Sequence, residues 1–328
     1  MVQAAGPLKH GDIFVVFNLH HELDAVAAFA ELRRQATRVI ELGFDGVALS
    51  EHHGGFPGYL PNPLQAAGLL LAGMPRGWVG GIPIILPLRS PAAIVEEAAW
   101  LDAAYPGRVV VGFAAGYVEA DFTAFGVPFA TRFPLFRKMF TDVADGLHGV
   151  SDLEMLRQDP AVASALGRIG LAMSTSGKQN ARLAGRLGAA IVPTQLTEGG
   201  YRELFAEYRA AGGTGARVVQ KWVHVGDPPT AAIDALNQGY TDAPGDHSWQ
   251  TAASRIVPMD DRDPARMAER ILAWVRAGDA SALAIRFQIG PLPATVVREQ
   301  IERFGAEVLP ALRQGLREIA AAEHAPGS

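Results

Sequence analysis

The chain has 328 residues, 49% of them hydrophobic, and a formal net charge of −5 at pH 7. This composition allows one large hydrophobic core, and no Ser/Gly-rich linker or run of like charges divides the chain. The 29 Lys and Arg residues are scattered, which excludes the basic patch typical of nucleic-acid-binding proteins. Cysteine is absent, which excludes disulfides, thiolate metal sites and a cysteine nucleophile. We therefore expect a single domain over residues 1–328.

The N-terminal region carries no pattern of an export signal or a membrane span. Its apolar stretch, Ile13–Phe17, is too short to cross a membrane and follows no basic segment of the kind that begins a secretory signal. We expect a cytoplasmic protein that does not contact a membrane.

Short apolar segments alternate with segments of helical period about eight times along the chain. The apolar segments are rich in Val, Ile, Leu and Ala, as are parallel strands buried on both faces. They comprise residues 12–18, 45–50, 78–86, 108–114, 168–174, 189–193, 217–225 and 282–289. The expected helices comprise residues 24–42, 62–74, 91–104, 131–147, 178–187, 200–211, 264–277 and 294–321. This alternation predicts an α/β fold, a (β/α)₈ TIM barrel, and the lack of a Gly-x-Gly-x-x-Gly turn after the first strand disfavours an open doubly wound sheet.

Two segments interrupt this alternation. Residues 226–262, after the seventh expected strand, are too long for an ordinary barrel connection. Their Gly and Pro residues, interleaved with Tyr240, His247 and Trp249, predict an insertion with a short helix near 230–238 that closes over the site as a mobile lid. The alternative is an insertion folded permanently against the barrel. The other segment, 148–167, is expected to be partly helical.

The second expected strand ends in Glu51, His52, His53 and Gly54. Barrel enzymes build their active sites at the carboxyl ends of the strands, and a histidine near pKa 6.5 can act there as acid or base. Because side chains alternate along a strand, we expect only one of the two histidines to face the barrel mouth. The alternatives are a histidine pair held in a loop by Glu51, and a metal site. We expect no metal, because neighbouring histidines on opposite faces of a strand chelate poorly.

A second candidate site follows the fifth expected strand, at Ser174, Thr175 and Ser176, just before the helix that begins near Lys178. Free amides and the dipole at a helix N-terminus attract an anion such as a phosphate group. The same residue types also cap ordinary helices, which is the alternative interpretation.

The end of the fourth expected strand reads Ala114, Ala115, Gly116 and Tyr117. These small residues leave room for a planar ring in the barrel mouth, beside which Tyr117 can pack or form a hydrogen bond. Tight packing of a helix on the strand is the alternative.

Two charged residues, Lys221 and Arg286, stand inside otherwise apolar strand segments. Because a buried charge is seldom left unpaired, each is expected to reach the mouth or to form an ion pair at its rim. We favour the ion pair for Lys221, and assign Arg286 and Gln288 to the substrate pocket.

Several motifs occur in an order that resembles the bacterial luciferase-like flavin-dependent monooxygenases. They are Glu51-His52-His53, Pro61-Asn62-Pro63, Leu86-Pro87-Leu88-Arg89-Ser90-Pro91, Gly107-Arg108, Gly116-Tyr117, Asp121-Phe122, Phe125-Gly126 and, more weakly, Ser174-Thr175-Ser176. The resemblance implies a (β/α)₈ barrel, usually dimeric, that binds reduced FMN or the reduced deazaflavin coenzyme F420 at its mouth.

The resemblance also implies roles for particular residues. Proton transfer falls to His52, with Glu51 and His53 beside it, and the FMN phosphate to the serines after strand five. Many relatives place a cation just after strand four, where this chain has Ala114 and Ala115. The phosphate is therefore expected to rely on the backbone, Lys178 or Arg182.

Three classes of function remain open. The first is a monooxygenase that uses O₂ and reduced FMN, supplied by a separate flavin reductase, to oxygenate a small, apolar or aromatic substrate. The second is an F420-dependent oxidoreductase that transfers hydride, and the third is a non-catalytic flavin-binding subunit. Glu51-His52-His53-Gly54 resembles the oxygenase branch more closely. A homodimer is expected through helices 62–74 and 91–104, because residues 63–72 have more apolar positions than one buried stripe requires.

Overall fold

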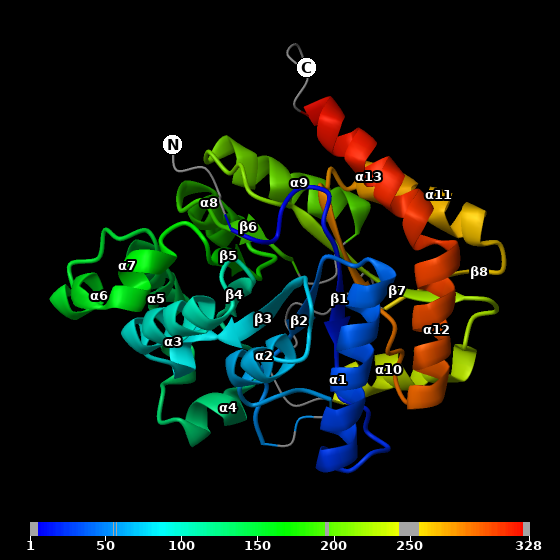
Figure 1. Cartoon of the computed structure of the whole chain (residues 1–328), viewed down its shortest axis with the longest axis horizontal. Helices are drawn as coiled ribbons and strands as arrows, with labels where there is room; N and C mark the ends of the chain where they lie inside the picture. The colour runs from blue at the N-terminus through cyan, green and yellow to red at the C-terminus, as the bar shows by residue number, and fades with distance from the viewer. Residues whose placement is uncertain (1–5, 55, 57, 194–196, 243–255, 324–328) are drawn as a thin grey trace.

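The computed structural model describes residues 6–54, 56, 58–193, 197–242 and 256–323. The strands are β1 (Ile13–Phe17), β2 (Gly46–Leu49), β3 (Trp78–Ile85), β4 (Val109–Ala114), β5 (Gly170–Met173), β6 (Ala190–Ile191), β7 (Val218–Val225), β8 (Met259–Asp261) and β9 (Ala282–Arg286). They form one parallel sheet in the order β6-β5-β4-β3-β2-β1-β9-β7-β8. A parallel bridge between Ile191 and Arg217 joins β6 to the start of β7 and closes the ring. The strands lie at the centre of the molecule, with the helices around them (Figure 1). The predicted (β/α)₈ barrel is confirmed.

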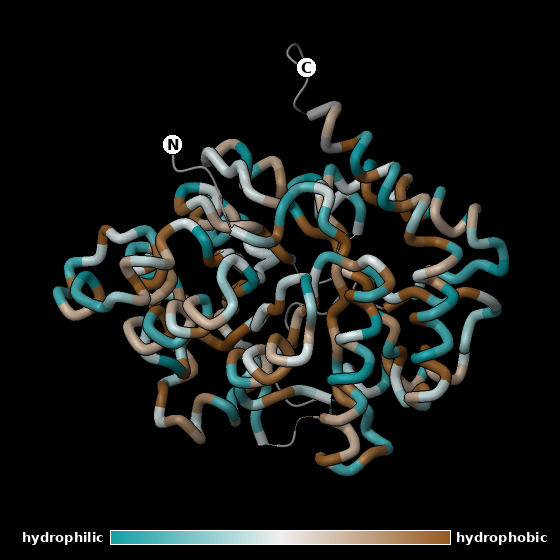
Figure 2. The backbone as a smooth tube through the Cα atoms, in the orientation of Figure 1, coloured by the Kyte–Doolittle hydropathy of each residue, from teal (hydrophilic) through white to brown (hydrophobic). Residues whose placement is uncertain are grey.

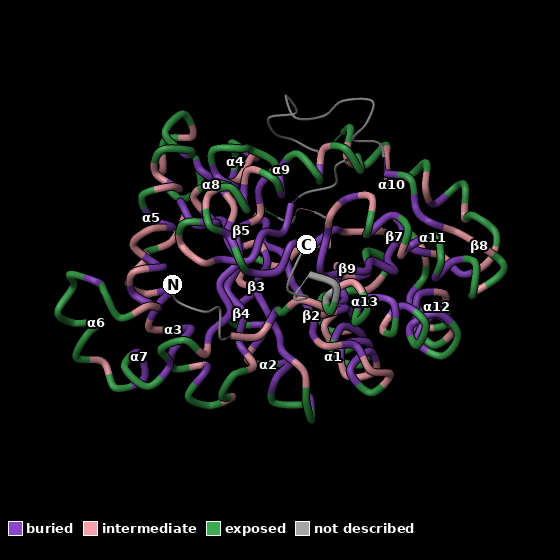
Figure 3. The backbone as a smooth tube through the Cα atoms, turned by 90° about the horizontal axis from the view of Figure 1, so that it is seen from above, coloured by how far each residue is buried: buried purple, intermediate pink, exposed green. Residues whose placement is uncertain are grey.

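Helices surround this barrel. They are α1 (Ala25–Leu42), α2 (Pro63–Leu71), α3 (Pro91–Ala104), α4 (Glu119–Ala124), α5 (Arg132–Leu147), α6 (Glu154–Gln158), α7 (Pro160–Ala165), α8 (Lys178–Arg186), α9 (Glu198–Ala210), α10 (Thr230–Asp242), α11 (Pro264–Ala277), α12 (Ala294–Glu307) and α13 (Leu309–Glu323), with short 3-10 turns at Leu86–Leu88 and Phe129–Thr131. Their outer faces are exposed, whereas the strands are buried at the centre (Figure 3). No helix in the described ranges is long and apolar enough to cross a membrane.

The structure departs from the expected elements in three places. The strand β8 lies within the insertion and pairs only with β7, which places β9 in the eighth barrel position. The short helix α4 was not expected. The expected helix 294–321 is two helices that meet at Val308, because Pro310 has no amide hydrogen and its ring opposes a continuous helix.

The interior of the barrel is built from Ala and Val residues around larger side chains that include Phe14, Trp78 and Ile82. A Cβ atom on Gly46 would lie 2.1 Å from the Trp78 ring, and one on Gly112 would lie 2.9 Å from Ile82. The apolar stretches of the strands run through the centre of the molecule, while the helices alternate apolar and polar faces (Figure 2). The glycines thus allow the large side chains to fill one end of the barrel.

A half-buried acid lies at the amino-terminal end of the barrel. The Oδ2 atom of Asp12 accepts hydrogen bonds from the Lys9 amide at 3.0 Å and from Trp78 Nε1 at 3.1 Å. Burial, and then the nearby charge of Asp45, raise the pKa of Asp12 to about 6.

Because the pKa of Asp12 is higher in the folded chain than in the unfolded one, the folded chain binds this proton more tightly. The free energy of unfolding should therefore fall as the pH rises from about 4 to about 6. Asp12→Asn keeps an oxygen for both hydrogen bonds and removes the charge, so it should be more stable than the wild type by roughly 1–2 kcal/mol at pH 7, with the gain shrinking towards pH 4. Denaturant unfolding at pH 4 to 8 measures this, with the exposed Asp142→Asn as control. A variant no more stable than the wild type at pH 7 would contradict the assignment.

Candidate active site

A cavity of about 980 Å³ opens at the carboxyl ends of the barrel strands. Its wall includes residues that follow β2, β4 and β5. Gln220 and Trp222 of β7, Arg286 at the end of β9 and one face of α10 also line it. This volume is in the range of pockets that hold a cofactor or a drug-sized ligand. The sequence motifs after the second, fourth and fifth strands therefore meet at one site.

His52 is buried in the wall of this cavity. Its Nδ1 atom lies 3.2 Å from Oδ2 of the buried Asp121, and its ring stacks on Phe56 with centroids 4.3 Å apart. The rings of Tyr59 and Tyr117 meet the imidazole nearly at right angles, at 4.7 and 5.1 Å. Among the described residues Nε2 makes no hydrogen bond. Asp121 thus fixes the ring orientation and leaves Nε2 as the nitrogen for a ligand.

Glu51 and His53 lie differently from His52. The carboxylate of Glu51 is buried, accepts hydrogen bonds from the Ile85 amide at 2.6 Å and from Arg89 Nη2 at 2.8 Å, and lies 3.1 Å from His53 Nε2. Glu51 borders the cavity, but its oxygens are occupied by these partners. His53 does not line the cavity, as the alternation of side chains along a strand predicts.

Asp121 has no role in the sequence interpretation, although Asp121-Phe122 is part of the motif series. It belongs to α4, a helix of six residues that was not expected. Only its place in the motif series marks it in the sequence. Its distance from His52, 69 residues along the chain, hides the pairing.

The turn between β5 and α8 lines the cavity with Ser174, Thr175, Ser176 and Gly177. Thr175 Oγ1 accepts hydrogen bonds from the Gly177 amide at 3.1 Å and from Asn180 Nδ2 at 3.3 Å. The Oδ1 atom of Asn180 is buried in the cavity wall and has no hydrogen-bond partner among the described residues. Rotation of this amide would instead present its NH₂ group to the cavity and its oxygen to the Thr175 hydroxyl. The turn therefore suits an anion that accepts hydrogen bonds, such as a phosphate.

The cations expected beside this turn point elsewhere. Lys178 lies 3.1 Å from Glu203 and Arg182 lies 2.7 Å from Glu207, and neither lines the cavity. The acids of α9 draw both cations to the outer side of α8. Arg132, at the start of α5, is the arginine that borders the cavity from the segment after β4. The sequence interpretation did not include it, because it stands 18 residues beyond Ala114 in the chain.

Ala114, Ala115, Gly116 and Tyr117 all line the cavity. Gly116 has a φ of +78°, and a Cβ there would lie 2.8 Å from both Ile85 and Phe122, so this turn requires glycine. Burial raises the pKa of the Tyr117 hydroxyl above its usual range, so the group stays protonated and can donate a hydrogen bond.

The insertion supplies one wall of the cavity. The expected helix near 230–238 is confirmed as α10, which is longer and lines the cavity with residues including Tyr240 and Asn237. The hydroxyls of Tyr240 and Tyr59 are 3.0 Å apart, which joins α10 to the segment after β2. His247 and Trp249 lie outside the described residues, so the lid stays a prediction.

Lys221 faces the helices rather than the cavity. Its Nζ lies 5.1 Å from the centre of the Trp274 ring, and among the described residues no carboxylate is within ion-pair distance of it. Burial lowers the pKa of Lys221, an effect that the charge of Glu198 opposes. The expected ion pair is thus replaced by an aromatic contact.

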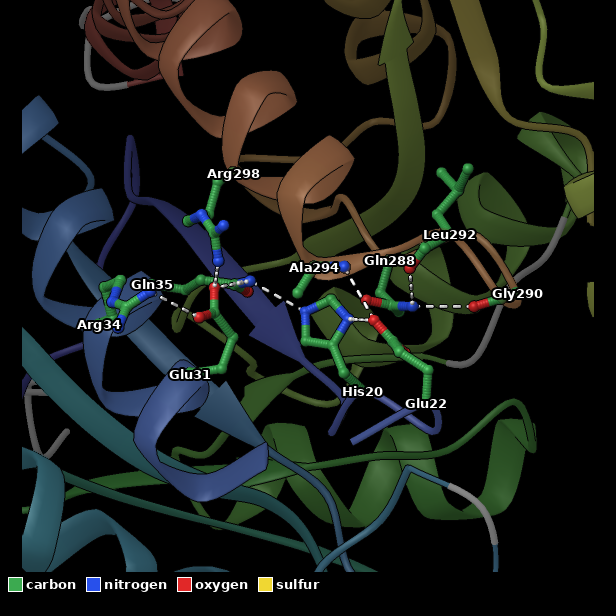
Figure 4. A network of polar contacts seen from close by, with 10 residues as sticks. All are labelled: His20, Glu22, Glu31, Arg34, Gln35, Gln288, Gly290, Leu292, Ala294 and Arg298. Carbon is green, nitrogen blue, oxygen red and sulfur yellow. Dashed lines mark hydrogen bonds and ion pairs between the residues drawn. The ribbon is translucent and has the colours of Figure 1, made fainter. Parts of the chain in front are cut away.

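A polar network with His20, Glu31 and Gln35 buried at its centre holds the loop after β1 (Figure 4). Gln35 donates to His20 Nε2 at 2.9 Å and to Glu31 at 2.8 Å, and Arg298 of α12 donates to the same Glu31 oxygen at 2.8 Å. Glu22 accepts from the Ala294 amide at 2.8 Å. These bonds tie the β1 loop to α1 and α12, so this edge of the barrel mouth is held rigidly.

The fold and this cavity define a (β/α)₈-barrel protein with a ligand site at the carboxyl ends of its strands. The sequence model of the luciferase-like monooxygenases matches residues 10–308, and the chain belongs to this family. Among the described residues, no group of three or more His, Asp or Glu side chains is placed to hold a metal ion.

Individual relatives agree with this family. The alkanal monooxygenase alpha chain of Photorhabdus luminescens is 41% identical over 86 residues, which cover 26% of this chain and only 24% of that relative. The oxygenating constituent of 3,6-diketocamphane monooxygenase from Pseudomonas putida, solved with FMN, has a TM-score of 0.72 at 16% identity, covering 92% of this chain and 98% of that one. An F420-dependent secondary alcohol dehydrogenase has a TM-score of 0.70 at 17% identity, covering 93% and 99%. The two structures share the fold.

Proposed function

We propose that this protein is a flavin-dependent monooxygenase that uses reduced FMN, delivered by a separate flavin reductase, and O₂ to oxygenate a small organic substrate. The observation that carries the proposal is the His52–Asp121 pair, buried among aromatic rings in the wall of a cavity large enough for cofactor and substrate together. The monooxygenase relatives and the FMN-bound neighbour support the choice of reaction and cofactor.

The residues of the cavity fit FMN. The turn Ser174–Gly177 with Asn180 would hold the phosphate, since it offers amides and an orphaned amide side chain. The small residues Ala114–Gly116 would leave space for the ring system, with Tyr117 beside it. When bound and reduced, FMN supplies the electrons that activate O₂.

The remaining chemistry falls to side chains of the chain itself. Because Asp121 holds the Nδ1 side of His52, the imidazole can accept or release a proton at Nε2 with its tautomer fixed. Phe56, Tyr59 and Tyr117 enclose the imidazole and exclude water from it. Glu51 and His53 serve this site by fixing the end of β2.

The second candidate is F420-dependent hydride transfer, favoured by the similarity to the F420-dependent alcohol dehydrogenase. The two are separated by titrating the protein with reduced FMN and with reduced F420 and then admitting air in the presence of candidate substrates. Tight binding of reduced FMN with oxygen-dependent product formation supports the monooxygenase. Binding of F420 alone, with turnover that needs no oxygen, would support the alternative.

The turn Ser174–Gly177 with Asn180, here called the phosphate cradle, gives a prediction that does not depend on activity. Reduced FMN should bind at least about tenfold more tightly than reduced riboflavin, because only FMN offers a phosphate for charge-assisted hydrogen bonds. Asn180→Leu should weaken FMN binding and leave riboflavin binding within about twofold. Lys178→Met is the matched control and should change neither, because Lys178 pairs with Glu203 outside the cavity. Fluorescence titration under anaerobic conditions measures all four affinities, and loss of FMN preference in Lys178→Met alone would place the phosphate elsewhere.

His52→Ala should bind reduced FMN with nearly normal affinity and lose about 10²–10⁴-fold in product formation, because its proposed role is proton transfer. Oxygen consumption should continue uncoupled from oxygenation. His53→Ala is the matched comparison: it lies outside the cavity against Glu51, so it should lower the melting temperature more than the turnover. Coupled turnover measured by product and oxygen assays decides between them. Near-normal turnover of His52→Ala with loss in His53→Ala would reverse the assignment.

We also propose a homodimer through α2 and α3. The described surface exposes Leu69 on α2 and Trp100 on α3, at 52% and 57%, and contact with a second copy of the chain would remove both apolar side chains from water. Light scattering at micromolar concentration should give twice the chain mass of 34.8 kDa. Leu69→Arg should shift the protein towards the monomer, and a monomeric wild type would contradict the proposal.

A further inference from the structure

One charged side chain in the cavity has no part in the proposed chemistry. Arg286 is the last residue of β9, is 8% exposed and lines the cavity. Burial of a guanidinium group is costly unless an anion or several hydrogen bonds compensate its charge. Elsewhere at the barrel mouth such compensation is present, as where Arg89 meets Glu51 at 2.8 Å.

The partners of Arg286 are neutral. Its Nη1 donates to Asn18 Oδ1 at 2.8 Å, its Nε donates to Gln220 Oε1 at 3.3 Å, and its guanidinium carbon lies 5.1 Å from the centre of the Trp222 ring. Across the described residues no carboxylate lies within ion-pair distance of Arg286, and its Nη2 makes no hydrogen bond. The two amides thus hold one side of the guanidinium and leave Nη2 for a ligand.

The surroundings of this cation are apolar. Trp222 packs with Ala232 and Ile256 in a small buried cluster beside it, and Trp222 and Ile256 also line the cavity. The charge of Arg286 acts on the hydroxyl of Tyr240, opposing the rise in pKa that burial causes there. A ligand at this place therefore meets a fixed positive charge at one point and apolar surface around it.

This region is separate from the phosphate cradle. The cradle follows β5, while Arg286 ends β9, and β6 and β7 lie between them in the closed ring. A cofactor phosphate bound after β5 would therefore leave the Arg286 region free for another ligand or for another part of the cofactor.

We propose that Arg286, held by Asn18 and Gln220, is an anion-binding subsite that receives the carboxylate of the organic substrate, so that the substrate is an apolar or aromatic acid. The proposal rests on the proposed function for the presence of a substrate in this cavity. A carboxylate matches the planar donors of the guanidinium and supplies the missing negative charge. A neutral substrate of the same shape would leave that charge uncompensated.

The test compares two probes that differ only in charge, 3-phenylpropanoate and 3-phenylpropanamide. Calorimetric titration of the flavin-free wild-type protein should show the carboxylate binding about tenfold or more tightly than the amide, as charge-assisted hydrogen bonds imply. Arg286→Gln should abolish this preference and keep the affinity for the amide within about twofold, and Arg286→Lys should retain part of it. Equal affinity of the two probes for the wild-type protein would overturn the proposal even if the glutamine variant did not fold.

Two further measurements separate this subsite from the rest of the site. His52→Ala should keep the carboxylate preference, so a loss of turnover with the preference intact shows that the two proposals are independent. Reduced FMN should bind Arg286→Gln and wild type with affinities within about twofold. If Arg286→Gln instead loses affinity for reduced FMN and keeps the carboxylate preference, the guanidinium serves the cofactor and the substrate subsite is refuted. If the preference follows Arg286 but no reduced cofactor supports turnover, the proposed function fails and the anion site stands.

Discussion

The carboxylate of Glu51 is the constraint on which the active-site end of the barrel depends. A buried carboxylate must be fully hydrogen-bonded, and Glu51 achieves this by taking the Ile85 amide from β3, the Arg89 side chain and the neighbouring imidazole of His53. These bonds join the ends of β2 and β3. Beyond this junction His52 turns inward, onto Asp121, and His53 turns outward, against Phe125.

The depth of the cavity depends on the interior of the barrel. Trp78 and Ile82 fill the space between strands only because Gly46 and Gly112 carry no side chain there. Towards the carboxyl ends the strands continue into Ala114 and Gly116, which leave room instead of filling it. Small residues therefore have two effects in this barrel. At one end they make room for large side chains that close the core, and at the other end they leave the mouth open.

The sequence predicts the structure best where an element depends only on the residues within it. Continuous apolar runs predict all eight barrel strands. The strand β8 is not predicted from the sequence, because its three residues, two of them acidic, show no apolar pattern. The position of a motif after a strand was enough to bring His52 and the Ser174–Ser176 turn to the cavity.

Contacts between distant segments were beyond such patterns. The residues near Lys178 in the sequence do not indicate its pairing with Glu203, which draws the Lys178 side chain away from the cavity. The residues near His52 likewise do not indicate its pairing with Asp121. Arg286 stands out in the sequence as a charge in an apolar strand, but its neutral partners lie far away in the chain, Asn18 in the loop after β1 and Gln220 in β7. Long-range pairing of side chains depends on the closed geometry of the barrel, which a local pattern does not contain.

The strand β8 gives the insertion a particular architecture. Its pairing with β7, together with the hydrogen bond from the Gly226 amide to the Asp261 carbonyl at 2.8 Å, brings the two ends of the insertion side by side. Within it, the Asn237 side chain binds both the amide and the carbonyl of Ile256. The insertion therefore starts and ends at neighbouring positions on the barrel. Replacement of the insertion by that of a related chain would change the cavity wall that α10 forms, while the pairing of the barrel strands stayed the same.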